Sequence, residues 1–430
     1  MKLNTKLKWA IVVAGFCLLH VLVFTRGFYS GGPDVETYYT YASKMQQGLV
    51  PYEEFTVEYP PGALAVFLLP RLVAGSLHAY GDAFTAEMLV FDLIGLFLVL
   101  GLGRKLKLSL WSCLIGYTLV MVAISSIMVQ RFDMVPAVIM LGALYAFSRG
   151  NYKTAWALLA VGTMTKLYPA ALAPIFLLYQ WRHQRWQTLA GSLITCAVML
   201  LAIALPFLWI DSHGFIASFT MQSQRSLQVE STYSSILLLG HTLGLPNVQP
   251  YQGRFSYDLY APLAQPLARY SFVVMGVAIL VVYSFFLWSY RRVKDLKLSG
   301  PPDTADMGRV LNYSFVAILV LLITSKVLSP QFIVWLYPLL PLVNGRFRAA
   351  MWVVFLVIGY LTWYIYPQHY YDLLDMQHIA IDVLVLRNIL LILMAVLLVG
   401  DGQTQAHREE PSDDLEPALF PAAPSAGAVS

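Results

Sequence analysis

Charged residues are scarce in this sequence: Asp, Glu, Lys and Arg together make up 12% of its 430 residues. A soluble globular protein carries about 25% charged residues. With so few charges, a chain of this length could not cover its surface with groups that water solvates. A soluble protein is therefore excluded, and most of the surface must face lipid. The net charge of +4 also excludes a nucleic-acid-binding protein that depends on a strongly basic surface.

Cysteine is rare as well, and several common site motifs are missing. The three cysteines, Cys17, Cys113 and Cys196, lie in separate apolar runs, which excludes a disulfide framework and a cysteine-based zinc site. The eight histidines show no metal-ligand spacing. No glycine-rich phosphate-binding loop is present, which argues against a nucleotide-dependent enzyme and an ATP-driven pump.

Apolar residues, in contrast, make up 58% of the chain, and the mean hydropathy is +0.64. A membrane-spanning helix requires about 20 mostly apolar residues. The first such run, 7–24, follows Lys2, Lys6 and Lys8 and resembles a signal peptide. It is long for one and lacks a clear cleavage site, so we expect a retained helix. Further spans are predicted near 84–102, 109–127, 134–148, 188–209, 268–290, 311–325, 331–344, 349–366 and 382–400.

The segment 154–180 is predicted to enter the membrane and return. Basic residues flank both of its ends, so both ends are expected on the same side. Each half would be about 18 Å long at about 1.5 Å per residue, which is short of the ~30 Å hydrocarbon core. We expect a break near 166–169. Broken backbone at this depth must be buried in protein or line a cavity.

Clusters of Lys and Arg occur in alternate connections, which is typical of the cytoplasmic side of a membrane protein. With the returning segment counted twice, about 12 passes are expected, with both termini cytoplasmic. The sequence thus predicts an all-α polytopic membrane protein with a transmembrane domain at 1–400 and a disordered tail at 401–430. The clusters are Arg104/Lys105/Lys107, Arg149/Lys153, Arg182/Arg185, Arg291/Arg292/Lys294/Lys297 and Arg346/Arg348.

Two connections on the opposite side, 27–83 and 210–267, are too long to be simple turns, and long ordered loops are usually functional. In the first we expect short interfacial helices at 36–47 and 63–78, the second interrupted by Pro70. A full span over 62–80 is the alternative. It would place the basic cluster that follows position 103 outside, against the charge pattern.

Asp34 is the candidate catalytic residue of the first loop. Gly31, Gly32 and Pro33 end the first span and set a turn. This turn would present the Asp34 carboxylate at the membrane surface, where it could take a proton from a hydroxyl group. The alternative is that Asp34 only caps the following helix. Glu58 precedes an extended Tyr-Pro-Pro sequence, which would hold it rigidly.

Isolated cations near the outer ends of spans form a second candidate group. Lys166 and Lys326 each stand alone in an apolar run, and Arg131 and Arg225 lie in outer connections. A charge at the centre of a span costs about 2.5–3.5 kcal/mol, so such residues usually face a polar cavity. Snorkelling to the interface is the alternative. Several cations around one cavity would suit an anionic lipid head group, above all a phosphate.

Two classes of function remain: a membrane glycosyltransferase, and a multi-pass transporter or flippase of a lipid-linked or anionic substrate. A transporter should show inverted repeats and ionisable residues at the membrane midplane. The segment 154–180 fits this pattern but has no counterpart in the other half. The carboxylates gather in loops, with Asp92 the exception. This distribution favours the enzyme.

Five passages resemble, in order, glycosyltransferase family 87, the polyprenyl-phosphate-mannose-dependent mannosyltransferases of the GT-C superfamily. The resemblance covers roughly residues 30–340. It implies a GT-C fold, in which a helical membrane bundle carries an acidic catalytic residue on its first outer loop. The passages are Asp34–Tyr38 with Gly48–Tyr52 and Glu58–Ala63, Arg131–Asp133 with Pro136, Thr165–Pro169, Arg225–Ser231 and Ser325–Gln331.

The resemblance also implies roles for these residues. Asp34 would be the general base, and Lys166, Arg131, Arg225 and Lys326 would bind the phosphate of a polyprenyl-phosphate sugar. Glu58, Tyr59, Gln228 and Glu230 would contact the sugar or the acceptor.

The expected reaction is transfer to a glycan or glycolipid on the non-cytoplasmic face of the cell membrane, with inversion at the anomeric carbon. Mannose is the expected sugar, with arabinose and glucose as alternatives. No cofactor is expected, although Glu53 and Glu54 could together bind a divalent cation.

Overall fold

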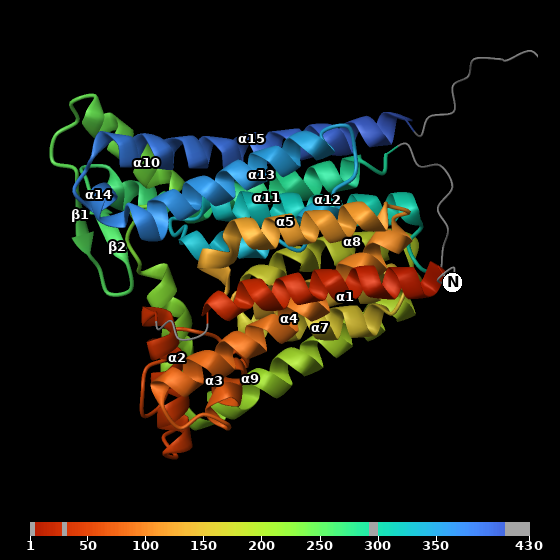
Figure 1. The fold of residues 1–430 in the computed structure, drawn as a ribbon, viewed down its shortest axis with the longest axis horizontal. Coiled ribbons are helices and arrows are strands. Elements are labelled where there is room, and N and C mark those ends of the chain that lie inside the picture. Colours follow the sequence, from red (N-terminus) through yellow and green to blue (C-terminus); the bar gives the residue numbers. More distant parts are fainter. Residues whose placement is uncertain (1–4, 28–31, 292–299, 409–430) are drawn as a thin grey trace, which may run out of the picture.

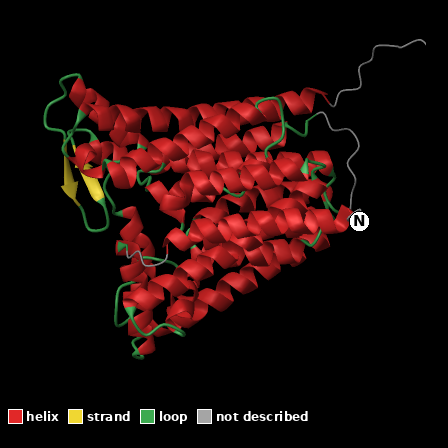
Figure 2. Cartoon of the chain, viewed as in Figure 1, coloured by secondary structure: helices red, strands yellow, loops and turns green. Residues whose placement is uncertain are grey.

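A computed structural model describes residues 5–27, 32–291 and 300–408. The chain forms a helical bundle with one small antiparallel hairpin, in which β1 (Gln249–Gln252) pairs with β2 (Tyr257–Tyr260) (Figure 2). This confirms the predicted all-α polytopic class. Eight of the described helical segments are long and apolar enough to cross a membrane: α1 (Thr5–Phe24), α4 (Leu77–Lys105), α5 (Leu110–Met128), α9 (Trp186–Ser223), α11 (Ala264–Trp288), α12 (Thr304–Thr324), α13 (Arg348–Trp363) with its continuation to Gln368, and α15 (His378–Arg408).

Shorter elements connect these helices. They include the α-helices α2 (Pro33–Gln46), α3 (Pro61–Arg71), α6 (Met134–Ser148), α7 (Tyr152–Thr165), α8 (Ala173–His183), α10 (Thr232–Thr242) and α14 (Tyr370–Leu374). They also include the 3₁₀ turns η1 (Thr25–Gly27), η2 (Tyr168–Leu172), η3 (Pro330–Trp335) and η4 (Leu340–Leu342), and the π-helical turn η5 (Tyr364–Gln368).

The returning segment is confirmed. Helix α7 ends at Thr165, Lys166 is extended, and the chain comes back through η2 and α8. The two ends of the segment meet, since Gln184 Nε2 donates a hydrogen bond to Tyr152 OH at 3.0 Å. One turn deeper, Trp156 Nε1 donates to Gln180 Oε1 at 2.5 Å.

The predicted span at 331–344 is wrong. This stretch contains only the 3₁₀ turns η3 and η4. Pro330 precedes it and Pro338 and Pro341 interrupt it, and proline removes a backbone donor and breaks a regular helix. Val334, Leu336 and Tyr337 are fully buried. The irregular backbone is therefore enclosed by protein, as an irregular segment at membrane depth must be.

In the first outer loop, the helix expected at 36–47 is observed as α2, whereas the helix expected at 63–78 ends earlier. Helix α3 stops at Arg71, and α4 begins after Ser76, whose side chain accepts a hydrogen bond from Ala79 N at 3.2 Å. The break therefore follows Pro70 instead of coinciding with it. The 62–80 segment is not a single span.

The predicted basic connections share one end of the bundle. The carbonyl oxygen of Gly300 accepts hydrogen bonds from Tyr152 OH at 2.8 Å and Gln184 Nε2 at 3.0 Å. Thr304 Oγ1 donates to the carbonyl oxygen of Lys105 at 3.4 Å. Figure 1 shows the start of α1 and the end of α15 at this end, and α2, α10, α14 and the β-hairpin at the other. Helix α15 continues to Arg408, and the rest of the predicted tail lies outside the described residues.

Asp92 is buried in the bundle and bonded on several sides. His20 contacts its carboxylate, and Tyr337 OH donates to its Oδ1 at 2.6 Å. Tyr117 OH donates to its backbone carbonyl at 2.8 Å. These contacts tie α1, α4 and α5 to the segment between η3 and η4.

Candidate active site

Asp34 lies in the first turn of α2, in an ion pair with Arg131. Gly32, not Asp34, is the N-cap residue, and no side chain caps the helix. A Cβ on Gly32 would lie 3.2 Å from Gln130 Oε1, so α2 begins close to the loop that carries Arg131. The Asp34 side chain is 31% exposed and that of Arg131 is 14% exposed. The carboxylate is therefore held by a cation and still reachable.

Arg131 connects this pair to a second segment. Its Nη2 donates a hydrogen bond to Tyr366 OH at 3.2 Å, and its guanidinium lies 5.9 Å from the centre of the Tyr366 ring. Tyr366 belongs to η5, after α13. Arg131 thus bridges the first outer loop and the last outer connection of the bundle.

Lys166 stands where α7 breaks, and its charge is compensated. Its Nζ donates to Asp133 Oδ1 at 2.6 Å, and the same oxygen accepts from Trp335 Nε1 at 2.6 Å. The ammonium also lies 4.7–5.3 Å from the ring centres of Phe132, Phe332 and Trp335. Asp133, which the sequence analysis did not identify as a site residue, therefore fixes the position of Lys166.

Glu58 reaches the same region because the turn after it packs closely on α7. A Cβ on Gly62 would lie 2.6 Å from the carbonyl oxygen of Met164, so only glycine allows this approach. Burial raises the pKa of Glu58, while Arg225, a hydrogen bond from Tyr59 and Lys166 act in the opposite direction. The Tyr59 ring packs edge-on against Phe132 at 5.0 Å.

Arg225 and Lys326 form a second cationic group. Arg225 Nη2 donates to Ser256 Oγ at 2.8 Å, and Ser256 Oγ donates to Asp258 Oδ1 at 2.9 Å. Lys326 Nζ donates to the carbonyl oxygen of Ser223 at 2.6 Å. Lys326 lies beyond the end of α12. Burial lowers the pKa of its ammonium, and the positive charge of Arg225 lowers it further. The carboxylate of Asp258 acts on both cations in the opposite direction, but at Lys326 its effect is smaller than that of Arg225, so a further anion near both is favoured.

Gln228 and Glu230 lie in the 224–231 loop and are almost fully buried, at 3% and 1% exposure. Gln228 joins this loop to the one after α12: its N–H donates to the carbonyl oxygen of Lys326 at 3.0 Å, and its Oε1 accepts from Ser329 Oγ at 3.2 Å. Burial raises the pKa of Glu230 to about 7, against the opposing effects of Arg387 and Arg131.

Electrostatic interactions link the predicted site residues into one group. Asp34 pairs with Arg131, and Lys166 interacts with both Arg131 and Glu58. Glu58 in turn interacts with Arg225, and Arg225 with Lys326. The site therefore combines a reachable carboxylate with several cations, an arrangement able to accept a proton and bind an anionic group.

Arg387, on α15, is a member of this site that the sequence analysis missed. It is the only basic residue in the predicted span 382–400, so the argument that singled out Lys166 and Lys326 could have found it.

The part of the chain that the structure describes contains no group of three or more His, Cys, Asp or Glu residues placed to hold a metal ion. The sequence analysis left a divalent-cation site at Glu53 and Glu54 open. Glu54 accepts a hydrogen bond from Val50 N at 2.6 Å. Glu53 is exposed.

Comparison with known proteins identifies the family. The model of glycosyltransferase family 87 matches residues 55–300, more than half of the chain; Asp34 and Lys326 lie outside this match. No curated protein sequence matches.

Two solved structures are similar at low identity, both of ArnT from Cupriavidus metallidurans. The form bound to undecaprenyl phosphate is 14% identical, with 93% of this chain and 78% of that chain covered and a TM-score of 0.48. The apo form is 13% identical, with 94% and 78% covered and a TM-score of 0.49. From the family match, the chain is a membrane glycosyltransferase that belongs to glycosyltransferase family 87.

Proposed function

We propose that the enzyme transfers a sugar, with mannose expected, from a polyprenyl-phosphate donor to a glycan or glycolipid acceptor. The transfer takes place on the extracytoplasmic face of the cell membrane, with inversion at the anomeric carbon. The observation that carries this proposal is the pairing of the partly exposed Asp34 with Arg131 beside several further cations. The basic end of the bundle is then cytoplasmic, with both termini.

In the proposed reaction, Asp34 accepts the proton of an acceptor hydroxyl as its oxygen attacks the anomeric carbon. The bond between that carbon and the phosphate oxygen breaks, and its electron pair leaves with the polyprenyl phosphate. Arg131 holds the Asp34 carboxylate in place. Since negative charge builds up on the leaving phosphate, fixed cations near it stabilise the transition state.

We assign binding of the donor's phosphate group to four cations, Arg225, Lys326, Arg131 and Lys166. Arg225 and Lys326 have the clearest reason to bind an anion, because it would relieve their mutual repulsion. Lys166 already gives one of its three N–H donors to Asp133, so it would contribute through the other two.

We assign the sugar or acceptor hydroxyls to Glu58, Tyr59, Gln228 and Glu230. Glu58 and Tyr59 are partly exposed. Gln228 and Glu230 are buried, so direct contact with a hydroxyl requires the 224–231 loop to move. No cofactor is proposed. Activity that survives EDTA would support this, and activity lost to EDTA and restored by a divalent cation would refute it.

The test uses purified protein in lipid nanodiscs, supplied with labelled polyprenyl-phosphate-mannose and a panel of glycan and glycolipid acceptors. The proposal predicts a labelled product whose anomeric configuration is opposite to that of the donor. Arabinose and glucose donors run in parallel identify the sugar. A product of retained configuration, or transfer only from a nucleotide sugar, would contradict the proposal.

A further inference from the structure

We infer that Arg387 is a positioning residue: through the buried carboxylate of Glu230 it holds Arg131 beside Asp34. The inference rests on the proposed function, in which Asp34 is the base and Arg131 its partner. Four charges of alternating sign, Arg387, Glu230, Arg131 and Asp34, connect the middle of α15 to the first outer loop.

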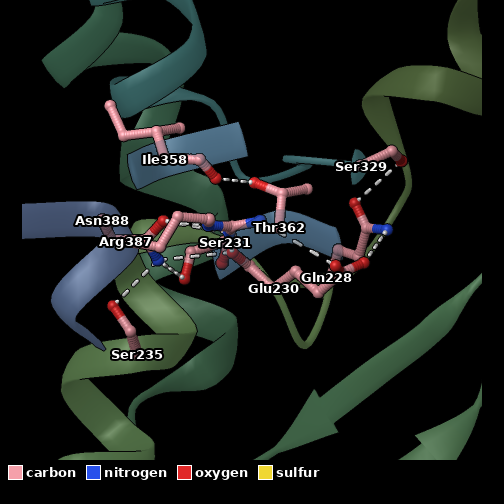
Figure 3. Close-up of polar contacts among 9 residues, drawn as sticks. All are labelled: Gln228, Glu230, Ser231, Ser235, Ser329, Ile358, Thr362, Arg387 and Asn388. Atoms are coloured by element: carbon pink, nitrogen blue, oxygen red, sulfur yellow. Dashed lines mark hydrogen bonds and ion pairs between the residues drawn. The ribbon is translucent and has the colours of Figure 1, made fainter. Parts of the chain in front are cut away.

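The first link is between α15 and the 224–231 loop (Figure 3). Arg387 Nη2 donates a hydrogen bond to the carbonyl oxygen of Glu230 at 2.6 Å and to Asn388 Oδ1 at 2.9 Å. Asn388 Nδ2 reaches the carbonyl oxygens of Glu230 and Ser231, both at 3.4 Å, and Ser235 Oγ at 3.2 Å. Most of these bonds go to main-chain oxygens, so the pair fixes the backbone of the loop as well as one side chain.

The second link is the charge on Glu230. Arg387 Nη1 lies 3.9 Å from Glu230 Oε1, which is beyond hydrogen-bond length. Oε1 is buried and has no hydrogen-bond partner among the described residues, and Oε2 meets only Gln228 Nε2, at 3.5 Å. A buried carboxylate with so few donors depends on nearby positive charge to remain ionised. Arg387 and Arg131 supply that charge.

The third link runs from Glu230 to Arg131, which is also paired with Asp34. When Glu230 is ionised, its charge attracts Arg131, which is also held by Asp34. When Glu230 is protonated, this attraction is lost. The other titratable group that faces Glu230 is Tyr370 of α14. Burial, followed by the charge of Glu230, raises the pKa of Tyr370, so it remains neutral near pH 7.

Because the pKa of Glu230 is about 7, turnover should rise with pH through this value and fall below it. An opposite charge nearby lowers the pKa of a carboxyl group by about 1–3 units. Arg387→Met should therefore raise the midpoint of the pH profile of kcat/KM by about 1–3 units, whereas Arg387→Lys keeps the charge and should stay close to the wild-type midpoint. Glu230→Gln should remove this ionisation from the profile.

The experiment combines two readouts on the full chain in nanodiscs. Infrared difference spectra against Glu230→Gln follow the protonation of Glu230 directly, and kcat/KM is measured from pH 5 to 9. The matched control is Arg309→Met, which removes another buried arginine, on α12, and should leave the Glu230 midpoint unchanged. If Arg387→Met folds poorly, Arg387→Lys and Glu230→Gln still decide the comparison.

The inference is supported if both midpoints move together in Arg387→Met. It is overturned if the infrared midpoint does not move, or if turnover falls equally at every pH, since a purely structural role would have that effect. If the wild-type protein transfers no sugar but Arg387→Met still shifts the infrared midpoint of Glu230, the proposed function is refuted. The charge coupling between Arg387 and Glu230 would then still hold.

Discussion

Removing the charge of Lys326 or Arg225 should weaken binding of the lipid phosphate. Both cations lie close enough to repel each other, and at Lys326 this repulsion outweighs the attraction of Asp258. Lys326 also donates to the carbonyl oxygen of Ser223, and Arg225 to the hydroxyl of Ser256. Two unit charges about 4 Å apart interact by about 4 kcal/mol at an effective dielectric constant of about 20. After desolvation, a hydrogen bond to a charged group contributes about 1.5–3 kcal/mol.

We therefore expect Lys326→Met and Arg225→Met each to weaken binding by about 10- to 150-fold. The assay measures the Kd of polyprenyl phosphate, the product of the reaction, for protein in nanodiscs. Lys44→Met is the control: Lys44 lies on α2, over the Phe55 ring at 5.2 Å, outside the group of site residues. If both site variants bound the lipid as tightly as wild type, the phosphate would have to lie elsewhere, and the reasoning from mutual repulsion would be refuted.

Three further predictions concern the surroundings of the site. Asp133→Asn should lower the free energy of unfolding by about 3–5 kcal/mol, because it leaves the largely buried charge of Lys166, which is 15% exposed, without its carboxylate partner. Thermal unfolding in nanodiscs measures this, and a double variant with Lys166→Met should recover part of the loss. Gly62→Ala should lower the Tm and turnover together, because the Cβ of the alanine would clash with the carbonyl oxygen of Met164, at a cost of about 1–3 kcal/mol. An unchanged Tm and turnover would refute the close packing. Glu58 has a raised pKa, so its carboxylate becomes protonated as the pH falls through that value. Glu58→Gln should therefore remove an acidic limb from the pH profile of kcat/KM. An unaltered profile would show that the charge of Glu58 is not used.

The charge pattern predicted the returning segment, whereas about 12 passes were expected and eight of the described helices are long and apolar enough to span. Basic residues at both ends of 154–180, together with Pro169, were sufficient to predict a segment that enters, breaks at Lys166 and returns. The run 331–344 was misread because apolar composition alone does not distinguish a spanning helix from buried 3₁₀ turns. The prolines at 338 and 341, with Pro330 directly before the run, were the available signal, since each removes a hydrogen bond that a lipid-exposed helix needs.

The site was predictable in part. Isolated charges in apolar runs pointed to Lys166 and Lys326, and the same reasoning applied to Arg387 would have found the cation beside Glu230. The partners were not predictable. That Asp133 compensates Lys166, and that Arg131 pairs with Asp34 across the first outer loop, depends on how α2, α6 and α7 pack. No sequence spacing encodes this packing.

The most direct test of the central claim is single-turnover transfer by Asp34→Asn in nanodiscs, with Glu36→Gln as the matched control. Glu36 lies in the same helical turn and is exposed. The ion pair of Asp34 is partly exposed, and such pairs contribute about 0–1 kcal/mol to stability, so both variants should fold and bind lipid phosphate. Loss of a general base lowers the rate by about 10²–10⁴-fold, and we expect that loss in Asp34→Asn and near-normal transfer in Glu36→Gln. Wild-type transfer by Asp34→Asn would contradict the account.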